Sequence, residues 1–437
     1  MIVDAGNLAL VVALLVSVYG VLGSFLGGWK RSPALVDSSR YALYSVPILL
    51  LISVFALVYA FVTKDFGVAY VVENSNLAMP DRYTWVAFYA GNAGSLLFIA
   101  FVYSVMAVAV ALSMVRRLPY TLPYATGLLG VLLAFFLFVI VFLANPLDRL
   151  AFALPDGEGI NPLLVHFGMF IHPPMQMAGL VSVALPFSIA MGALMAGRGG
   201  RDEWVDLGRM WGMASWLILT IGLLLGSWWA YTILGWGGYW AWDPVENSAL
   251  MPWLALTAFV HSIMVQKRRG MFRMWNIVLV TVAFTLAQMG MFINRGGPVP
   301  SVHSFGQSTM GWLFLVFMGA TLLGSLAVFA WRSGSLKSRE RLDSILSRES
   351  AFLTQNVLFL AVAMVTLWGT IYPVISEATQ GLTITVGRPF FDRVNGPLLL
   401  VLVFLMGVGP LLPWRRASTR NVLHALRYPL GSAAIGV

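Results

Sequence analysis

The sequence contains no cysteine, and charged residues occupy only 10% of its 437 positions. The absence of thiols excludes disulfides, thiolate nucleophiles, and cysteine-ligated zinc or iron–sulfur sites. Soluble globular domains carry about a quarter charged residues, so the composition also excludes an ordinary soluble protein. Whatever chemistry this chain performs therefore uses other side chains.

Apolar residues make up 59% of the chain and fall into one long run after another. Runs of about 18 or more apolar residues are typical of membrane-spanning helices. We expect an all-α, polytopic membrane protein that forms one domain over 1–437. Its eleven predicted spans are 7–27, 40–63, 92–115, 122–145, 175–197, 207–233, 247–266, 273–293, 309–331, 351–374 and 396–414. A short apolar stretch at 430–437 predicts the opening turns of a partial twelfth span, as in a truncated chain.

Basic residues are distributed unevenly between the two sides of the predicted membrane domain. The net charge is +9, and 21 of the 27 Lys and Arg residues lie in or beside connections that follow odd-numbered spans. Because Lys and Arg accumulate in cytoplasmic connections, this distribution predicts that the N-terminus lies outside. The positive charge is then a topology signal. We therefore expect contacts with membrane lipid and no nucleic-acid partner.

The densest chemical signal lies in an outer connection, residues 234–247, which contains the string GWGGYWAWDPVEN. Its aromatic and turn-forming residues are Trp236, Gly237, Gly238, Tyr239, Trp240, Trp242 and Asp243. A simple interfacial belt explains Trp228, Trp229 and Trp253 about equally well, but it does not require this grouping. We expect the segment to form a flat apolar surface for a large planar ligand. A porphyrin fits, since stacking on indoles removes apolar area from water.

Histidine is the usual neutral nitrogen ligand of heme iron, and the chain has only five. His172, just before the fifth predicted span, and His303, between the eighth and ninth, flank the aromatic segment on the outer side. This placement predicts a bis-imidazole iron site. The alternative is that each histidine only orders its own loop. We expect His166 to be a packing residue and His424 to be solvated.

His261 differs because it lies inside the seventh predicted span. It precedes the basic residue Lys267 by six positions, roughly 9 Å along a helix. An ionisable residue within a span indicates a functional site, and the alternative is an interhelical hydrogen bond through the imidazole. His261 therefore indicates a second site, deeper in the membrane than the aromatic segment.

The ordered string WGGYWAWDPVEN, with histidines on both sides, resembles the tryptophan-rich WWD signature of heme-handling proteins of cytochrome c maturation. That family has three branches, CcmF, CcsA and CcmC. The length of the chain and several further strings resemble CcmF: GNLAL at 6–10, DFGVAYV at 65–71, NPLL at 161–164, HPP at 172–174, NRG at 294–296 and GPLL at 409–412. The resemblance covers the whole chain.

This resemblance implies a heme lyase that adds the two thiols of an apocytochrome c C-x-x-C-H motif across the heme vinyl groups. It implies that His172 and His303 hold the incoming heme against the tryptophan segment. It also implies that His261 ligates a resident b-type heme, whose second histidine belongs to a later span beyond residue 437. Asp243 is expected to shape the loop through backbone hydrogen bonds.

The resemblance further implies a bacterial cytoplasmic membrane, with the active site facing the periplasm or cell exterior. Partners would be apocytochrome c, a heme chaperone and other maturation subunits, and membrane quinol would donate electrons. Arg295, near His303 in sequence, would pair with a heme propionate, or else it is a snorkelling interfacial arginine. The rival functions are a heme transporter or delivery protein and a CcsA-type lyase. A transporter would need a polar pathway through the spans, of which the sequence has little.

Overall fold

The computed structural model describes residues 1–233, 238–299, 301, 310–338, 340, 342–418, 420, 422–424, 426–427 and 431. In this part of the chain, eleven helical segments are long and apolar enough to cross a membrane. The only β feature among these residues is an isolated bridge between Val68 and Arg149. The predicted all-α, multi-span fold is confirmed.

Most connections at the basic side are short, and the two longest, 63–91 and 143–167, lie at the opposite side. The bounds of the helices are α1 (Ile2–Lys30), α2 (Pro33–Val62), α3 (Ala69–Asn74), α4 (Asp81–Thr84), α5 (Asn92–Met114), α6 (Leu122–Phe142), α7 (Gly168–Ser182), α8 (Ala184–Met195), α9 (Val205–Ile233), α10 (Pro244–Arg269), α11 (Arg273–Gly296), α12 (Met310–Arg332), α13 (Arg348–Gln380) and α14 (Arg388–Val408). Five short 3-10 helices accompany them: η1 (Val86–Tyr89), η2 (Pro162–Leu164), η3 (Asp202–Trp204), η4 (Ser333–Leu336) and η5 (Gly409–Leu411).

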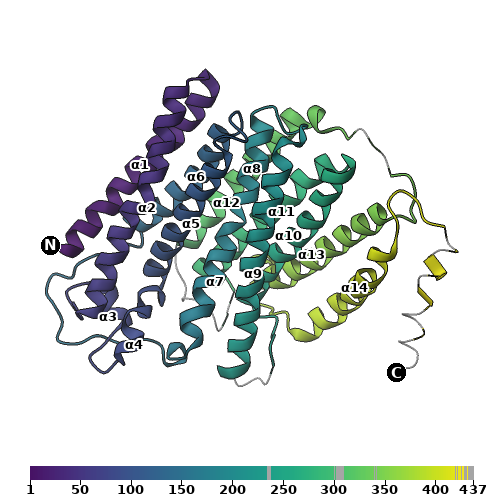
Figure 1. The fold of residues 1–437 in the computed structure, drawn as a ribbon. Helices are drawn as coiled ribbons and strands as arrows, with labels where there is room; N and C mark the ends of the chain where they lie inside the picture. Colours follow the sequence, from purple (N-terminus) through teal and green to yellow (C-terminus); the bar gives the residue numbers. More distant parts are fainter. Residues whose placement is uncertain are drawn as a thin grey trace.

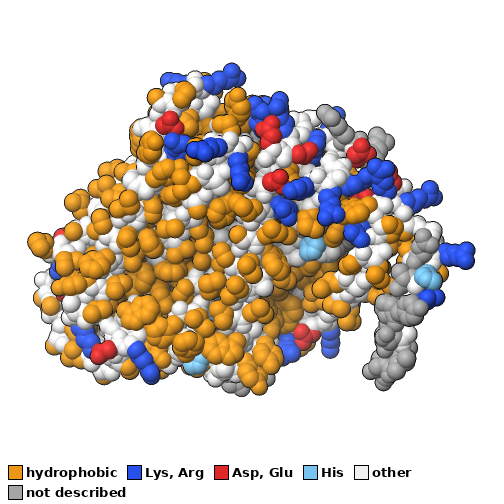
Figure 2. All heavy atoms as spheres, in the orientation of Figure 1, with side chains coloured by type: hydrophobic (Ala, Val, Ile, Leu, Met, Phe, Trp, Pro, Cys, Tyr) orange, Lys and Arg blue, Asp and Glu red, His pale blue; other side chains and the backbone are white. Residues whose placement is uncertain are grey.

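The bundle is elongated, with the α1–α2 pair at one end and the α13–α14 pair at the other (Figure 1). Burial identifies its centre, because 94% of the most apolar window of the α7–α8 span is buried, against 11% for the span that begins with α14. Exposed apolar side chains cover the middle of the face shown in Figure 2, and basic side chains gather mainly along its upper edge. Lipid tails are as apolar as these side chains, so the outer helices need no further cover.

The fifth span begins earlier than the sequence predicts. It was expected at 175–197, but α7 begins at Gly168 and contains His172, Pro173 and Pro174. A proline inside a helix leaves the carbonyl four residues earlier without its N–H partner, which is costly in a membrane. The hydroxyl of Tyr89 donates to that carbonyl, on Met169, at 2.9 Å. His172 therefore belongs to a helix and not to a loop before it, which corrects the expectation.

α7 and α9 approach closely enough to position side chains across their contact. A Cβ atom added at Gly179 would lie 2.6 Å from the Cα of Leu219. Small residues permit this kind of close helix packing in membranes. The outer halves of the same two helices carry the histidine and tryptophan residues considered next.

Candidate functional site

His172 is held in a fixed orientation between α7 and α9. Its Nδ1 lies 3.0 Å from the carbonyl oxygen of Gly222. A carbonyl only accepts, so Nδ1 is the donor, and this contact selects the tautomer and orients the ring. Gly226, one turn further along α9, also packs against the imidazole, and an added Cβ there would lie 2.7 Å from Cε1. Helix α9 thus offers a backbone surface shaped to this ring.

Two tryptophans at the end of α9 complete an aromatic cluster with His172 of α7 and with His166, which lies just before α7. Trp229 meets the His172 ring edge-on, with centroids 5.6 Å apart, and stacks on His166 at 6.2 Å. Trp228 lies 5.7 Å from His166, whose Nδ1 accepts the N–H of Gly168 at 3.0 Å. We call His166, His172, Trp228 and Trp229 the α7–α9 cluster. From the sequence, a membrane belt and a ligand surface explain Trp228 and Trp229 about equally well. Their position just before the glycine-rich string was the available signal for the second.

The aromatic segment between α9 and α10 does not present one flat surface. The rings of Trp240 and Trp242 are 6.0 Å apart and nearly perpendicular, at 87°. Tyr239, which is exposed, stacks on Tyr231 of α9 at 4.7 Å and 18°. These two indoles therefore do not lie in one plane, unlike the flat apolar surface expected of the segment. Of the other predicted residues here, Gly238 is described, whereas Trp236 and Gly237 lie outside the described residues.

Trp242 anchors the segment to α14. Its backbone has a φ of 59°, in the left-handed region that bulky residues rarely adopt. Its ring stacks on Phe391 at 5.1 Å and 12°, and its Nε1 donates to Asp392 Oδ1 at 2.9 Å. The amide of buried Asn247 donates to the Trp242 carbonyl at 2.9 Å. These contacts offset the cost of the strained backbone and hold the loop against a distant part of the chain.

Two carboxylates shape the start of α10. Asp243 is the N-cap, and its Oδ1 accepts the N–H of Val245 at 3.0 Å. Glu246 Oε2 accepts the N–H groups of Asp243 at 3.1 Å and Ala241 at 2.9 Å. This is a capping box, which satisfies backbone donors that the helix itself cannot pair. Asp243 thus acts on loop structure, as a residue in its position is expected to.

The connection that follows α11 is tied to the same cap. Ser301 Oγ lies 2.6 Å from Asp243 Oδ1, to which it donates a hydrogen bond. Ser301 precedes the second predicted outer histidine, His303, by two residues, and His303 lies outside the described residues. The contact brings the start of that connection to the aromatic segment, and the ligand role of His303 stays a prediction.

Arg295 is completely buried where α11 meets the start of α5. Its Nη1 donates to Ser95 Oγ at 2.6 Å and to Asn92 Oδ1 at 3.0 Å. Tyr70 of α3 lies nearby, and burial raises the pKa of its hydroxyl well above the usual range, so the phenol stays neutral beside the guanidinium. Arg295 is not a snorkelling interfacial residue here. Its predicted propionate contact has no counterpart among these partners and stays a prediction.

His261 lies on α10 and faces α13. Its Nδ1 is 2.8 Å from the carbonyl of Thr257, so Nδ1 donates and Nε2 is the nitrogen that can bind a metal. The rings of Phe352 and Phe359 lie 5.7 and 6.5 Å away. No group of three or more His, Asp or Glu gathers as a metal site anywhere in the described ranges. A single imidazole beside aromatic rings suits a heme iron, because the porphyrin supplies four ligands and each axial ligand can come from a different helix.

Comparisons with known proteins agree with one another. Residues 89–297 match the profile of the family described as Cytochrome C assembly protein. The chain is 37% identical to the cytochrome c-type biogenesis protein CcmF of Haemophilus influenzae and 37% identical to that of Escherichia coli, with 98% of the chain and 66% of each relative covered. A solved structure of the cytochrome c heme lyase CcmF gives a TM-score of 0.81 at 31% identity, covering 99% of this chain and 67% of that one. The chain thus spans just under two thirds of the length of these curated relatives.

Proposed function

Because this chain belongs to the CcmF family of cytochrome c-type biogenesis proteins, we propose that it is a heme lyase subunit that positions heme for covalent attachment to an apocytochrome c. The observation that carries the proposal is the α7–α9 cluster. There an imidazole of fixed tautomer lies against tryptophan. The aromatic segment of residues 238–242 contacts the same helix, α9, through the stack of Tyr239 on Tyr231. An imidazole with an oriented ring next to indole surfaces suits an iron porphyrin.

In this proposal heme is the substrate, and the chain contributes position rather than a covalent nucleophile. His172 supplies an axial nitrogen, and His303 is its proposed partner on the opposite connection. Each cysteine thiol of the apocytochrome adds its sulfur to one carbon of a vinyl group and its hydrogen to the other, so the addition involves no net oxidation. Fixing the vinyl groups beside the thiols replaces an encounter in solution by a reaction between held groups.

A resident b-type heme fits the surroundings of His261. When bound there, such a heme would supply one-electron transfer, with membrane quinol as the proposed donor. Within the chain, Thr257 orients the imidazole, and Phe352 and Phe359 of α13 place aromatic rings beside it. The chain's own contribution is thus one oriented nitrogen in an apolar setting, which favours a tightly held cofactor.

We place the protein in the bacterial cytoplasmic membrane, with the α7–α9 cluster facing the periplasm. The excess of basic residues at the other end of the helices supports this orientation through the positive-inside rule. Apocytochrome c, a heme chaperone and further maturation subunits are the proposed partners. A periplasmic site is reasonable because its substrate thiols belong to proteins of that compartment.

The proposal is tested by comparing His172→Ala, His261→Ala and the exposed control His424→Ala. We expect His261→Ala to lose the resident b-type absorbance in the pyridine hemochrome spectrum of the purified protein. His172→Ala should retain that absorbance and lower covalent heme on a C-x-x-C-H reporter cytochrome by at least tenfold. His424→Ala should match the unmodified protein in both measurements.

Equal heme content and equal attachment in all three variants would contradict the proposal. Heme that is bound at the outer end and passed on without any thioether on the reporter would instead support a delivery protein. A variant that changes only the b-type absorbance affects the membrane site, and a variant that changes only covalent heme on the reporter affects the outer site.

A further inference from the structure

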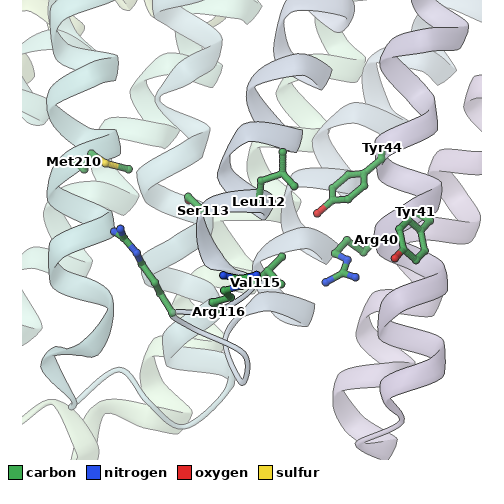
Figure 3. A pocket seen from close by; sticks show the side chains of 9 residues that line it. Arg40, Tyr41, Tyr44, Leu112, Ser113, Val115, Arg116 and Met210 are labelled. Carbon is green, nitrogen blue, oxygen red and sulfur yellow. The ribbon is translucent and has the colours of Figure 1, made fainter.

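A groove of about 580 Å³ lies at the basic end of the membrane domain, between α2, α5 and α9. Arg40 and Tyr44 of α2 form one wall, Leu112 of α5 lies in the middle, and Met210 of α9 lies across from them (Figure 3). Met210 precedes Trp228 by 18 residues on α9, which corresponds to about 27 Å along the helix. The groove is therefore separate from the α7–α9 cluster.

The groove is strongly basic. Arg40, Arg116 and Arg117 all line it. Only one carboxylate pairs with this set among the described residues, since Asp37 contacts Arg40 Nη2 at 3.0 Å and neither Arg116 nor Arg117 forms an ion pair. Three cations against one anion leave an unbalanced positive charge, which favours an anionic ligand.

Two buried polar atoms of the α2 wall have no hydrogen-bond partner. They are Arg40 Nε and Tyr44 Oη, one helical turn apart. The Arg40 guanidinium also lies 5.2 Å from the Tyr41 ring centroid and 6.0 Å from that of Tyr44, and its side chain is only 14% exposed. Buried donors without acceptors are uncommon and costly. An oxygen-rich anion would satisfy both, and a guanidinium matches phosphate oxygens well.

Apolar side chains form much of the rest of the groove. Leu112 and Met210 are exposed to the surroundings of the protein, and Val115 is a further apolar residue of the lining. Such a surface suits a hydrocarbon chain rather than water. The ligand that fits both parts of the groove carries an anionic, oxygen-rich head and an apolar tail.

We propose that this groove binds one anionic phospholipid, with its phosphodiester between Arg40, Arg116 and Tyr44 and an acyl chain along Leu112 and Met210. Basic pockets between helices at the membrane surface are typical sites for anionic headgroups. A free phosphate would meet the arginines but leave the apolar walls unused. This site is independent of the proposed heme chemistry.

The test uses the full chain purified in a nonionic detergent and native mass spectrometry with added dioleoyl phosphatidylglycerol. We expect one tightly bound copy, and weaker binding of dioleoyl phosphatidylcholine. Arg116→Gln/Arg117→Gln should weaken phosphatidylglycerol binding about twentyfold, because each basic residue near an anionic lipid contributes roughly fivefold. Both arginines are exposed, so the double variant should fold normally.

The matched control is Lys30→Gln/Arg31→Gln, which removes two adjacent exposed charges at the same membrane end but outside the groove. It should change binding less than twofold. Tyr44→Phe, which removes only the unpartnered hydroxyl, should weaken binding severalfold. Equal losses in the control, equal binding of phosphatidylcholine, or displacement of the lipid by millimolar inorganic phosphate would each overturn the proposal.

Discussion

Single hydrogen bonds to backbone carbonyls decide which histidine nitrogen carries the proton at both candidate sites. The carbonyl of Gly222 takes the Nδ1 proton of His172, and the carbonyl of Thr257 takes that of His261. Both rings thereby adopt the tautomer in which Nε2 is the basic nitrogen, the form that binds a metal. Such second contacts typically change metal affinity by about 10- to 100-fold when they are lost.

The surface that α9 presents to His172 leads to a prediction for Gly226. A Cβ at this position would lie 2.7 Å from the imidazole, so Gly226→Ala must displace the ring. We expect heme affinity at the outer site to fall by about tenfold, while the absorbance attributed to His261 is unchanged. Gly324→Ala is the control, because nothing lies within 4 Å of its added Cβ. Titration of the purified variants with heme measures both, and an equal effect of the two substitutions would contradict the argument.

Helix α10 shows how one element can define a loop. Its N-terminal capping box draws Ala241, Asp243 and Val245 into one turn, and Ser301 joins that turn from the connection after α11. Trp242 is held within the turn by α14. The geometry of the aromatic segment therefore depends on the start of α10 as much as on its own residues.

This dependence predicts the effect of replacing Glu246. Glu246→Ala removes the acceptor of two backbone N–H groups, and losing a cap of this kind costs about 1 kcal/mol. The amide hydrogens of Ala241 and Asp243 should exchange with solvent about fivefold to tenfold faster. Glu246→Gln retains an acceptor oxygen and should change exchange little. Amide exchange read by mass spectrometry checks this, and unchanged protection in Glu246→Ala would refute the cap's role.

At the scale of the whole molecule, the two ends of the helices differ in the side chains that they carry. The aromatic cluster and the capped loop lie at one end of the helices, and the basic groove lies at the other. The central α7–α8 span is largely buried, whereas few residues of the spans that begin with α12 and α14 are buried. The two candidate binding regions are thus separated by the thickness of the membrane domain.

The orientation of the bundle can be tested directly because the chain has no cysteine. We expect a membrane-impermeant maleimide to label Leu77→Cys, at the aromatic end, in intact bacterial cells. Ile345→Cys, in the connection between α12 and α13, should react only after the membrane is permeabilised. Both positions are well exposed, and the unmodified protein provides the background. The reverse pattern would invert the proposed topology.

Some properties of this protein follow from its sequence alone. The number of membrane-spanning helices is such a property, because the hydrocarbon thickness sets the length of each apolar run that must cross it. The aromatic segment can also be identified from the sequence, because the order of its residues is a local feature. The position of His261 along its helix can be read in the same way, from its distance in residues to the helix end. The role of Asp243 in shaping the loop through backbone hydrogen bonds is a further such property, because its partner Val245 is only two residues away.

Other properties required the tertiary structure, because they depend on partners distant in sequence. His172 belongs to a helix since Tyr89 supplies the hydrogen bond that Pro173 cannot. The rings of Trp240 and Trp242 are perpendicular, and α14 fixes the orientation of Trp242. The interior position of Arg295 depends on its hydrogen bond to Ser95 of α5. Composition and spacing determine which groups enter the membrane, whereas packing between distant segments determines what each group faces there.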